Sequence, residues 1–186
     1  MPILPEEPAT FPDDLFDHDL LHSDRGRKWR LVHTRPRQEK MLARFFRMRG
    51  ISYFMPCSQR RHIIRGKMFT SFLPIFPGYL FLYADDEEHH VGVTCRHAAS
   101  VQMIPDQQRF DSDIRQVRSL IACGAPVTAE DKLEPGMEVE IKQGPLKGLT
   151  GKILSGVSGR RFVVVVNFLH RGASVMLDDA MLAKVS

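Results

Sequence analysis

Residues 29–50 read WRLVHTRPRQEKMLARFFRMRG and pass from a strand to a helix. The first five residues alternate apolar and polar side chains, which is typical of a strand with one buried face. Pro36 suits the first position of a helix, and apolar residues then recur at helical spacing, for example at Met41 and Phe45. Gly50 follows, where a residue in the left-handed conformation commonly ends a helix. The stretch therefore predicts a domain that mixes strands and helices.

Further elements are predicted after this stretch. Residues 51–56 and 76–83 are β-prone. Residues 59–72 form two short apolar runs around a basic turn that contains a glycine, which predicts a hairpin. Residues 111–122 predict a second amphipathic helix. We therefore expect residues 28–122 to form one domain, with an antiparallel sheet flanked by helices.

The composition changes after residue 122. Residues 123–135 contain two prolines, a glycine and three acids, which is typical of a linker. Residues 136–186 then hold five short β-prone runs, at 138–141, 150–154, 162–168, 173–177 and 182–185. Five short strands in about fifty residues predict a small closed β-barrel. The expected fold class is α+β, with an N-terminal α/β sandwich and a C-terminal five-stranded barrel.

Charge is distributed unevenly along the chain. Residues 1–24 contain seven acids and no Lys or Arg, whereas residues 25–70 contain fourteen Lys and Arg and one acid. A basic block of this kind attracts polyanions, because Lys and Arg release counterions from a phosphate backbone; the alternative is a solvated basic face without a partner. We expect residues 1–27 to be a disordered acidic tail. Tethered beside the basic block, the tail is either an internal competitor for it or a solubilising segment.

Several classes of protein are not expected. The three cysteines, Cys57, Cys95 and Cys123, lie far apart and form no CxxC pair, which argues against a disulfide framework or a zinc site. The histidines and acids assemble no nucleophile–base signature, and no apolar run reaches the roughly 18 residues of a membrane span. The sequence predicts a cytoplasmic, non-enzymatic protein that needs no metal or cofactor.

Four elements in this order resemble the NusG family of transcription factors. They are the Trp29–His33 strand, the basic helix with Glu39, the turn Phe76-Pro-Gly-Tyr79, and the glycine-rich segment Lys142–Lys152. The resemblance covers residues 28–186. It implies an N-terminal domain that binds RNA polymerase, a linker, and a C-terminal barrel of the KOW type.

The resemblance also assigns a polymerase-binding surface. Members of the family, including the specialised factor RfaH, hold the clamp helices of the largest polymerase subunit in an aromatic pocket. The residues that match this pocket here are Trp29, Phe76, Pro77, Tyr79 and Phe81. Strand alternation puts the last two on one face, and leucines on the other. The alternative is that all five belong to the core.

Two further sets of contacts are implied. In RfaH-like proteins the first turn and the first helix approach the displaced non-template DNA strand, and the basic hairpin tip here resembles the RfaH loop and is assigned to the same partner. The matching residues are Arg35, Arg37, Gln38, Lys40, Arg44, Arg65 and Lys67. In the barrel, Leu169 and Arg171 match a loop that contacts ribosomal protein S10 or the termination factor Rho; an ordinary turn is the alternative.

The resemblance implies a monomeric elongation or antitermination factor that bridges the polymerase cleft and suppresses pausing or termination. The RfaH-like hairpin and the acidic tail favour a specialised paralogue over the housekeeping factor. Gly144, Pro145 and the run 163–166 disfavour helix, so the barrel is expected to be permanent. The alternatives are a KOW-containing ribosomal or RNA-binding protein and an accessory domain of a DNA-binding enzyme.

Overall fold

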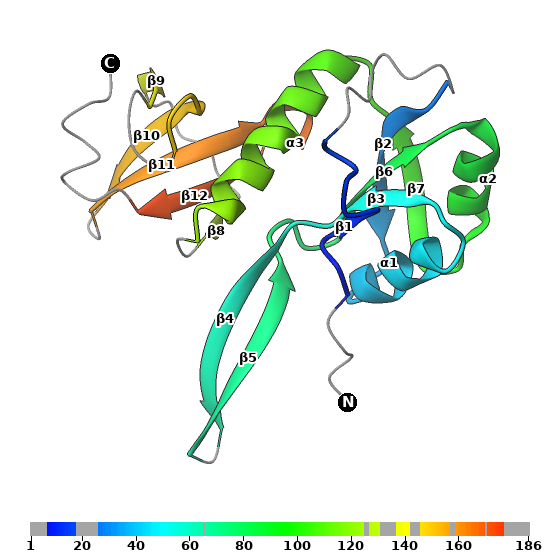
Figure 1. Cartoon of the computed structure of the whole chain (residues 1–186), viewed down its shortest axis with the longest axis horizontal. Helices are drawn as coiled ribbons and strands as arrows, with labels where there is room; N and C mark the ends of the chain where they lie inside the picture. Colours follow the sequence, from blue (N-terminus) through cyan, green and yellow to red (C-terminus); the bar gives the residue numbers. More distant parts are fainter. Residues whose placement is uncertain are drawn as a thin grey trace. The chain divides into compact units, whose positions relative to one another are not determined.

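The structure of the chain is a computed structural model (Figure 1). The structure describes residues 7–17, 26–64, 66–124, 127–130, 137–141, 146–156, 159–169 and 171–176. The chain divides into two compact units, residues 1–108 and 109–186, which are described separately.

The N-terminal unit contains a five-stranded antiparallel sheet. Its strands run in the order β1-β3-β6-β2-β7, so the early strand β2 lies in the interior with β6 and β7 on either side. Their bounds are β1 Thr10–Phe11, β2 Lys28–Thr34, β3 Ser52–Phe54, β6 Tyr79–Ala84 and β7 Ala98–Met103. In the central pair, Leu31 is opposite Phe81 and Val32 is opposite Leu80.

Two helices cover one face of this sheet, called here the helix face. They are α1 (Glu39–Arg47) and α2 (Asp86–Thr94). Leu42 and Phe46 of α1 are buried in one cluster with the alternate sheet residues Val32, Leu80 and Leu82. This is the face to which alternation assigned the leucines, because successive side chains of a strand point to opposite faces.

The ends of α1 show which local signals decide its length. Gly50 has a φ of +68°, the left-handed conformation that ends the helical segment as predicted. Arg37 has a φ of +61°, which is uncommon for a residue with a Cβ. Because a left-handed residue interrupts the right-handed helix, α1 begins at Glu39 and not at Pro36.

The opposite face of the sheet is rich in aromatic side chains and is called here the aromatic face. The register places Trp29, Phe54, Tyr79, Phe81 and Tyr83 on it. Leu15 and Phe16 are buried, and the ring of Phe16 contacts the rings of Trp29 and Phe54. The predicted disorder of residues 1–27 is therefore wrong for residues 7–17, because this segment carries its own apolar anchors and one strand of the sheet.

The predicted hairpin is confirmed. Strands β4 (Cys57–Ile64) and β5 (Lys67–Pro74) pair antiparallel along their whole length. Figure 1 shows them extending away from the five-stranded sheet. Most of the side chains described on them are exposed, including the directly opposed pair Ile63 and Met68.

The C-terminal unit combines helix α3 (Gln107–Ala122), whose first two residues belong to the N-terminal unit, with a second antiparallel sheet in the order β8-β12-β11-β10-β9. The strands are β8 Thr128–Glu130, β9 Met137–Glu140, β10 Thr150–Gly156, β11 Gly159–Val166 and β12 Arg171–Met176, with a short 3-10 turn at Asn167–Leu169. A Cβ on Gly151 of β10 would lie 2.3 Å from the carbonyl oxygen of Val163 on the neighbouring strand β11, so only glycine fits at this position.

The predicted fold class is confirmed, as an N-terminal antiparallel sheet with helices and a separate C-terminal set of strands. In the C-terminal unit, one strand lies where a linker was predicted. Strand β8 lies inside the predicted linker 123–135 and pairs with β12 at the edge of the second sheet. The predicted strand at 182–185 lies outside the described residues.

Candidate functional site

The basic segment separates into cations with and without acidic partners. Four arginines form ion pairs: Arg27 with Glu88 (2.6 Å), Arg30 with Asp86 (2.6 Å), and Arg44 and Arg47 with Glu7 (2.5 and 3.1 Å). These arginines hold α2 and the N-terminal segment to the rest of the unit. Arg44, predicted to bind nucleic acid, is therefore engaged in an ion pair within the chain.

Three other cations lie between the end of β2 and the first turn of α1. Arg35 and Arg37 are exposed and Lys40 is half-buried, and none of the three forms an ion pair with an acid that the structure describes. Gln38, predicted beside them, does not point freely into solvent, because its Oε1 bonds Nδ1 of His97 at 2.9 Å. Burial lowers the pKa of His97, and the neighbouring Arg96 lowers it further.

The hairpin carries a second group of cations. Arg60, Arg61 and Lys67 are exposed on it. Arg65, the other predicted contact of the hairpin, lies outside the described residues. Since the hairpin extends away from the sheet (Figure 1), this group and the group at Arg35 lie on different parts of the unit.

The five predicted polymerase contacts differ in exposure. Trp29, Phe76 and Phe81 are no more than 1% exposed, so in this structure they act as core residues and not as an exposed patch. Pro77 is exposed and Tyr79 is half-buried. The expected open aromatic surface is thus reduced to one edge, because residues 7–17 and the neighbouring aromatic rings pack over the rest.

The exposed aromatic edge is fixed by a hydrogen-bonded turn. Gly78 has a φ of +83°. Its N–H donates to Oε1 of Glu39 at 2.8 Å, and its carbonyl accepts from the N–H of Thr34 at 2.8 Å. The ring of Tyr79 stacks on His33, with centroids 5.2 Å apart. The turn therefore places Pro77 and Tyr79 beside the chain segment that carries Arg35 and Arg37.

Glu39 and Glu7 are two acids whose roles the sequence analysis missed. Glu39 is the only acid in residues 25–70, and that isolation among cations was a usable signal of a structural partner. Glu7 belongs to an acidic run, and nothing in that run distinguishes it from Glu6 or Asp13. Glu7 pairs with Arg44 and Arg47 because the folded segment 7–17 brings it next to α1, and the sequence alone does not show this.

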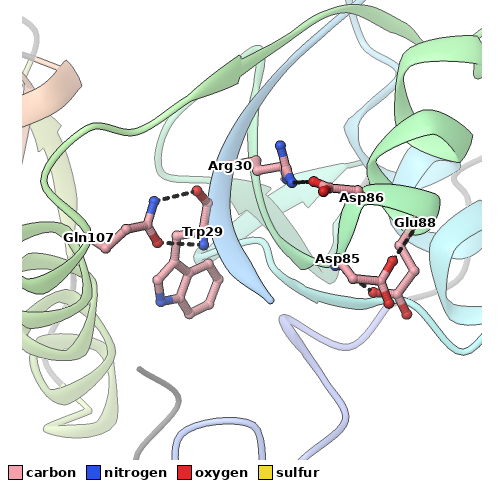
Figure 2. A network of polar contacts seen from close by, with 6 residues as sticks. All are labelled: Trp29, Arg30, Asp85, Asp86, Glu88 and Gln107. Atoms are coloured by element: carbon pink, nitrogen blue, oxygen red, sulfur yellow. Dashed lines mark hydrogen bonds and ion pairs between the residues drawn. The ribbon is translucent and has the colours of Figure 1, made fainter. Parts of the chain in front are cut away.

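A second polar network fixes the other end of β2 (Figure 2). The side-chain amide of Gln107 accepts from the N–H of Trp29 at 2.7 Å and donates to its carbonyl at 2.8 Å. Beside it, Arg30 reaches Asp86 in the first turn of α2. That helix begins with a capping box, in which Asp85 and Glu88 bond each other's backbone N–H groups. Trp29 is held by its backbone as well as by its ring.

The predicted partner residues of the C-terminal unit lie at the start of β12. Leu169 and Arg171 are both half-buried. The preceding Phe168 packs edge-on against Phe110 of α3, with ring centroids 6.4 Å apart. On the same helix, Gln116 Oε1 accepts from the N–H and the hydroxyl of Thr150, at 2.7 and 3.0 Å. Helix α3 therefore packs next to the loop that holds both predicted contacts.

Within the described ranges, no group of His, Cys, Asp or Glu is arranged to hold a metal ion. No helix found there is long and apolar enough to cross a membrane. What the N-terminal unit presents is an aromatic edge and clusters of cations, which suit protein and polyanion contacts.

Comparisons with known proteins identify the family of the chain. The family model described as "Transcription termination factor nusG" matches residues 27–121, just over half of the 186 residues. No curated protein sequence matches the chain. Among solved structures, "Domain interaction in Thermotoga maritima NusG" matches with 17% sequence identity and a TM-score of 0.49, covering 86% of this chain and 96% of that chain. By the match of the family model, the chain belongs to the NusG family of transcription factors.

Proposed function

We propose that the N-terminal unit binds RNA polymerase during elongation and suppresses pausing or termination. One observation carries the proposal. The Gly78 turn presents Pro77 and Tyr79, and its two hydrogen-bond partners, Thr34 and Glu39, bracket Arg35 and Arg37. An exposed aromatic edge and cations that form no ion pair with a described acid therefore lie at one place.

The aromatic edge and the neighbouring cations suit different partners. A partly exposed tyrosine offers a large apolar surface and a polar tip, a combination that is frequent at protein interfaces. We assign it to the clamp helices of the largest polymerase subunit. The cations Arg35, Arg37 and Lys40 suit a phosphate backbone, and we assign them to the non-template DNA strand. The exposed cations of the hairpin, including Lys67, provide a second contact with nucleic acid.

The effect on transcription follows from differential affinity. A protein that binds the elongating and the paused polymerase equally well shifts nothing between them. A factor that contacts both the clamp and the displaced strand binds best when both are in their elongating positions, so it favours that state. This mechanism requires no catalytic group.

For the C-terminal unit we propose recruitment of a further protein, ribosomal protein S10 or Rho, through Leu169 and Arg171. Because α3 packs beside this loop, access to it depends on how α3 is held. We propose residues 28–122 and 136–186 as the functional domains. The segment 123–135 connects them.

The proposal is tested with reconstituted elongation complexes. Tyr79→Ala is expected to weaken binding by about 1–3 kcal/mol, typical of a contact aromatic, whereas Tyr79→Phe keeps the ring and most of the affinity. Circular dichroism of each variant checks that the unit is folded. Co-purification with ribosomal subunits instead of RNA polymerase would refute the assignment and favour an RNA-binding protein.

A further inference from the structure

Residues 7–17, called here the strap, are attached to the aromatic face by their apolar end. Phe16 lies with its ring stacked on Trp29 at a centroid distance of 5.8 Å and edge-on to Phe54 at 5.0 Å. Phe54 in turn packs against Phe81 at 6.0 Å. Leu15 and Phe16 are each 4% exposed. The strap therefore adds a ring to the aromatic cluster from which the polymerase contacts were predicted.

Backbone hydrogen bonds attach the middle of the strap to the sheet. Strand β1 pairs with β3, with Thr10 opposite Phe54 and Phe11 opposite Tyr53. The N–H of Met55 donates to the carbonyl of Ala9 at 2.6 Å. The hydroxyl of Tyr53 donates to the carbonyl of Pro8 at 3.1 Å. A paired segment of two residues is a short strand, so this attachment is limited in strength.

Charge attaches the other end of the strap. The Glu7 side chain is 1% exposed and accepts from Arg44 at 2.5 Å and from Arg47 at 3.1 Å. Burial raises the pKa of the Tyr53 phenol, and the carboxylate of Glu7 raises it further. Glu7 thus pairs with Arg44 and Arg47 of the basic segment, while Phe16 packs on the aromatic face.

We propose that the strap is an autoinhibitory contact that RNA polymerase must displace in order to bind the aromatic face. The inference rests on the proposed function. The strap covers Trp29 and Phe54 with the ring of Phe16 and pairs Arg44 and Arg47 with one carboxylate. It therefore makes, within one chain, the apolar and the ionic contacts that an apolar and anionic partner would make. While it is in place, only Pro77 and Tyr79 of the five predicted polymerase contacts reach solvent.

Displacement is feasible because the strap can leave without breaking the rest of the sheet. It lies at the edge of the sheet, in the order β1-β3-β6. Its Phe11 is only partly buried where it packs against the cluster that Val32 and Leu80 form with α1, so the strap's departure removes a peripheral contact of that cluster. A binding site that is open only part of the time has its apparent affinity reduced by the open fraction. Weakening the strap therefore raises affinity for the polymerase.

The test uses the full chain and purified RNA polymerase. Phe16→Ala is expected to tighten binding about tenfold and Glu7→Gln about threefold, through a larger open fraction. Asp13→Asn is the matched control, because it removes one negative charge from an exposed position of the same strap. The affinity of this control for RNA polymerase is expected to stay within about twofold of the wild-type value. Thermal unfolding identifies any variant that loses its fold, and Glu7→Gln, which preserves side-chain shape, is the variant on which the test then depends.

Hydrogen exchange provides a readout that needs no variant. In the wild-type chain, the amide of Met55 is expected to exchange faster when polymerase is bound, because its acceptor, the Ala9 carbonyl, leaves with the strap. The amide of Ile75, which donates to Pro56 at 2.8 Å, is the internal reference. Equal affinity of all variants with unchanged or slower Met55 exchange overturns the inference and leaves the proposed function standing. Absence of polymerase binding by every variant overturns both.

Discussion

On one face of the N-terminal sheet, α1 and α2 pack against aliphatic residues, whereas on the other the strap packs against aromatic rings. The helices are joined to strands at both ends, so they cannot leave the helix face without breaking the sheet. The strap has a two-residue strand at the sheet edge and one buried acid. The two coverings therefore differ both in the residues that they bury and in how cooperatively they are attached. We therefore expect stability to depend mainly on the helix face, and availability for the proposed binding to depend on the aromatic face.

The largest effect is expected on the helix face. Phe46→Ala removes a fully buried ring that packs with Leu42, Leu80 and Leu82, and is expected to lower the free energy of unfolding by about 3–5 kcal/mol. Denaturation followed by circular dichroism and by tryptophan fluorescence measures it. Because Trp29 is on the aromatic face, coincident shifts in both signals show that the helix face controls the whole unit. A shift confined to one signal would refute that.

An intermediate effect is expected where the strap is held by charge. Glu7→Gln leaves Arg44 and Arg47 without their carboxylate and is expected to lower the stability of the strap by about 1–3 kcal/mol, the contribution of hydrogen bonds to charged groups. The measurement is the exchange rate of the Met55 amide in the free protein. This rate should rise more than that of amides in β6, since local opening does not require global unfolding. Equal acceleration throughout would mean that both faces form one cooperative unit.

The smallest effect is expected at the start of α2. Asp85→Ala removes the side chain that caps the helix by accepting from the N–H of Glu88 at 2.9 Å, at a cost of about 1 kcal/mol. Thermal unfolding detects the loss, and the exchange rate of Met55 is expected to remain unchanged. A faster Met55 exchange in this variant would show that the helix face and the strap are coupled.

The sequence was sufficient where local chemistry determines the structure. The alternation in residues 79–83 placed the leucines on the helix face, and Gly50 ended the segment of α1, because periodicity and backbone preference act over a few residues. The hairpin also followed from its apolar runs and its glycine turn.

The candidate site could be predicted only in part. Trp29 and Phe81 were matched to the polymerase-binding surface, with a place in the core as the alternative. Phe16, which stacks on Trp29, is more than ten residues before it, in a segment of acidic composition. Composition averages over a segment, so the prolines and acids of residues 1–27 outweighed Leu15 and Phe16, the apolar residues that anchor the strap. In the same way, residues 123–135 were assigned to a linker because of their prolines and acids. The pairing of β8 with β12 is a long-range contact that composition does not reveal.

The position of β1 at the edge of the sheet has a further consequence for solution behaviour. With the strap in place, the outermost strand is two residues long and offers little unpaired backbone to another molecule. Without it, β3 becomes the edge, and its N–H and carbonyl groups are open to pairing with a strand of a second copy. The open state would then be the one most prone to self-association. A segment that restrains binding would also act as a guard against aggregation, and release of the strap would be safest when a partner is already present to cover the exposed edge.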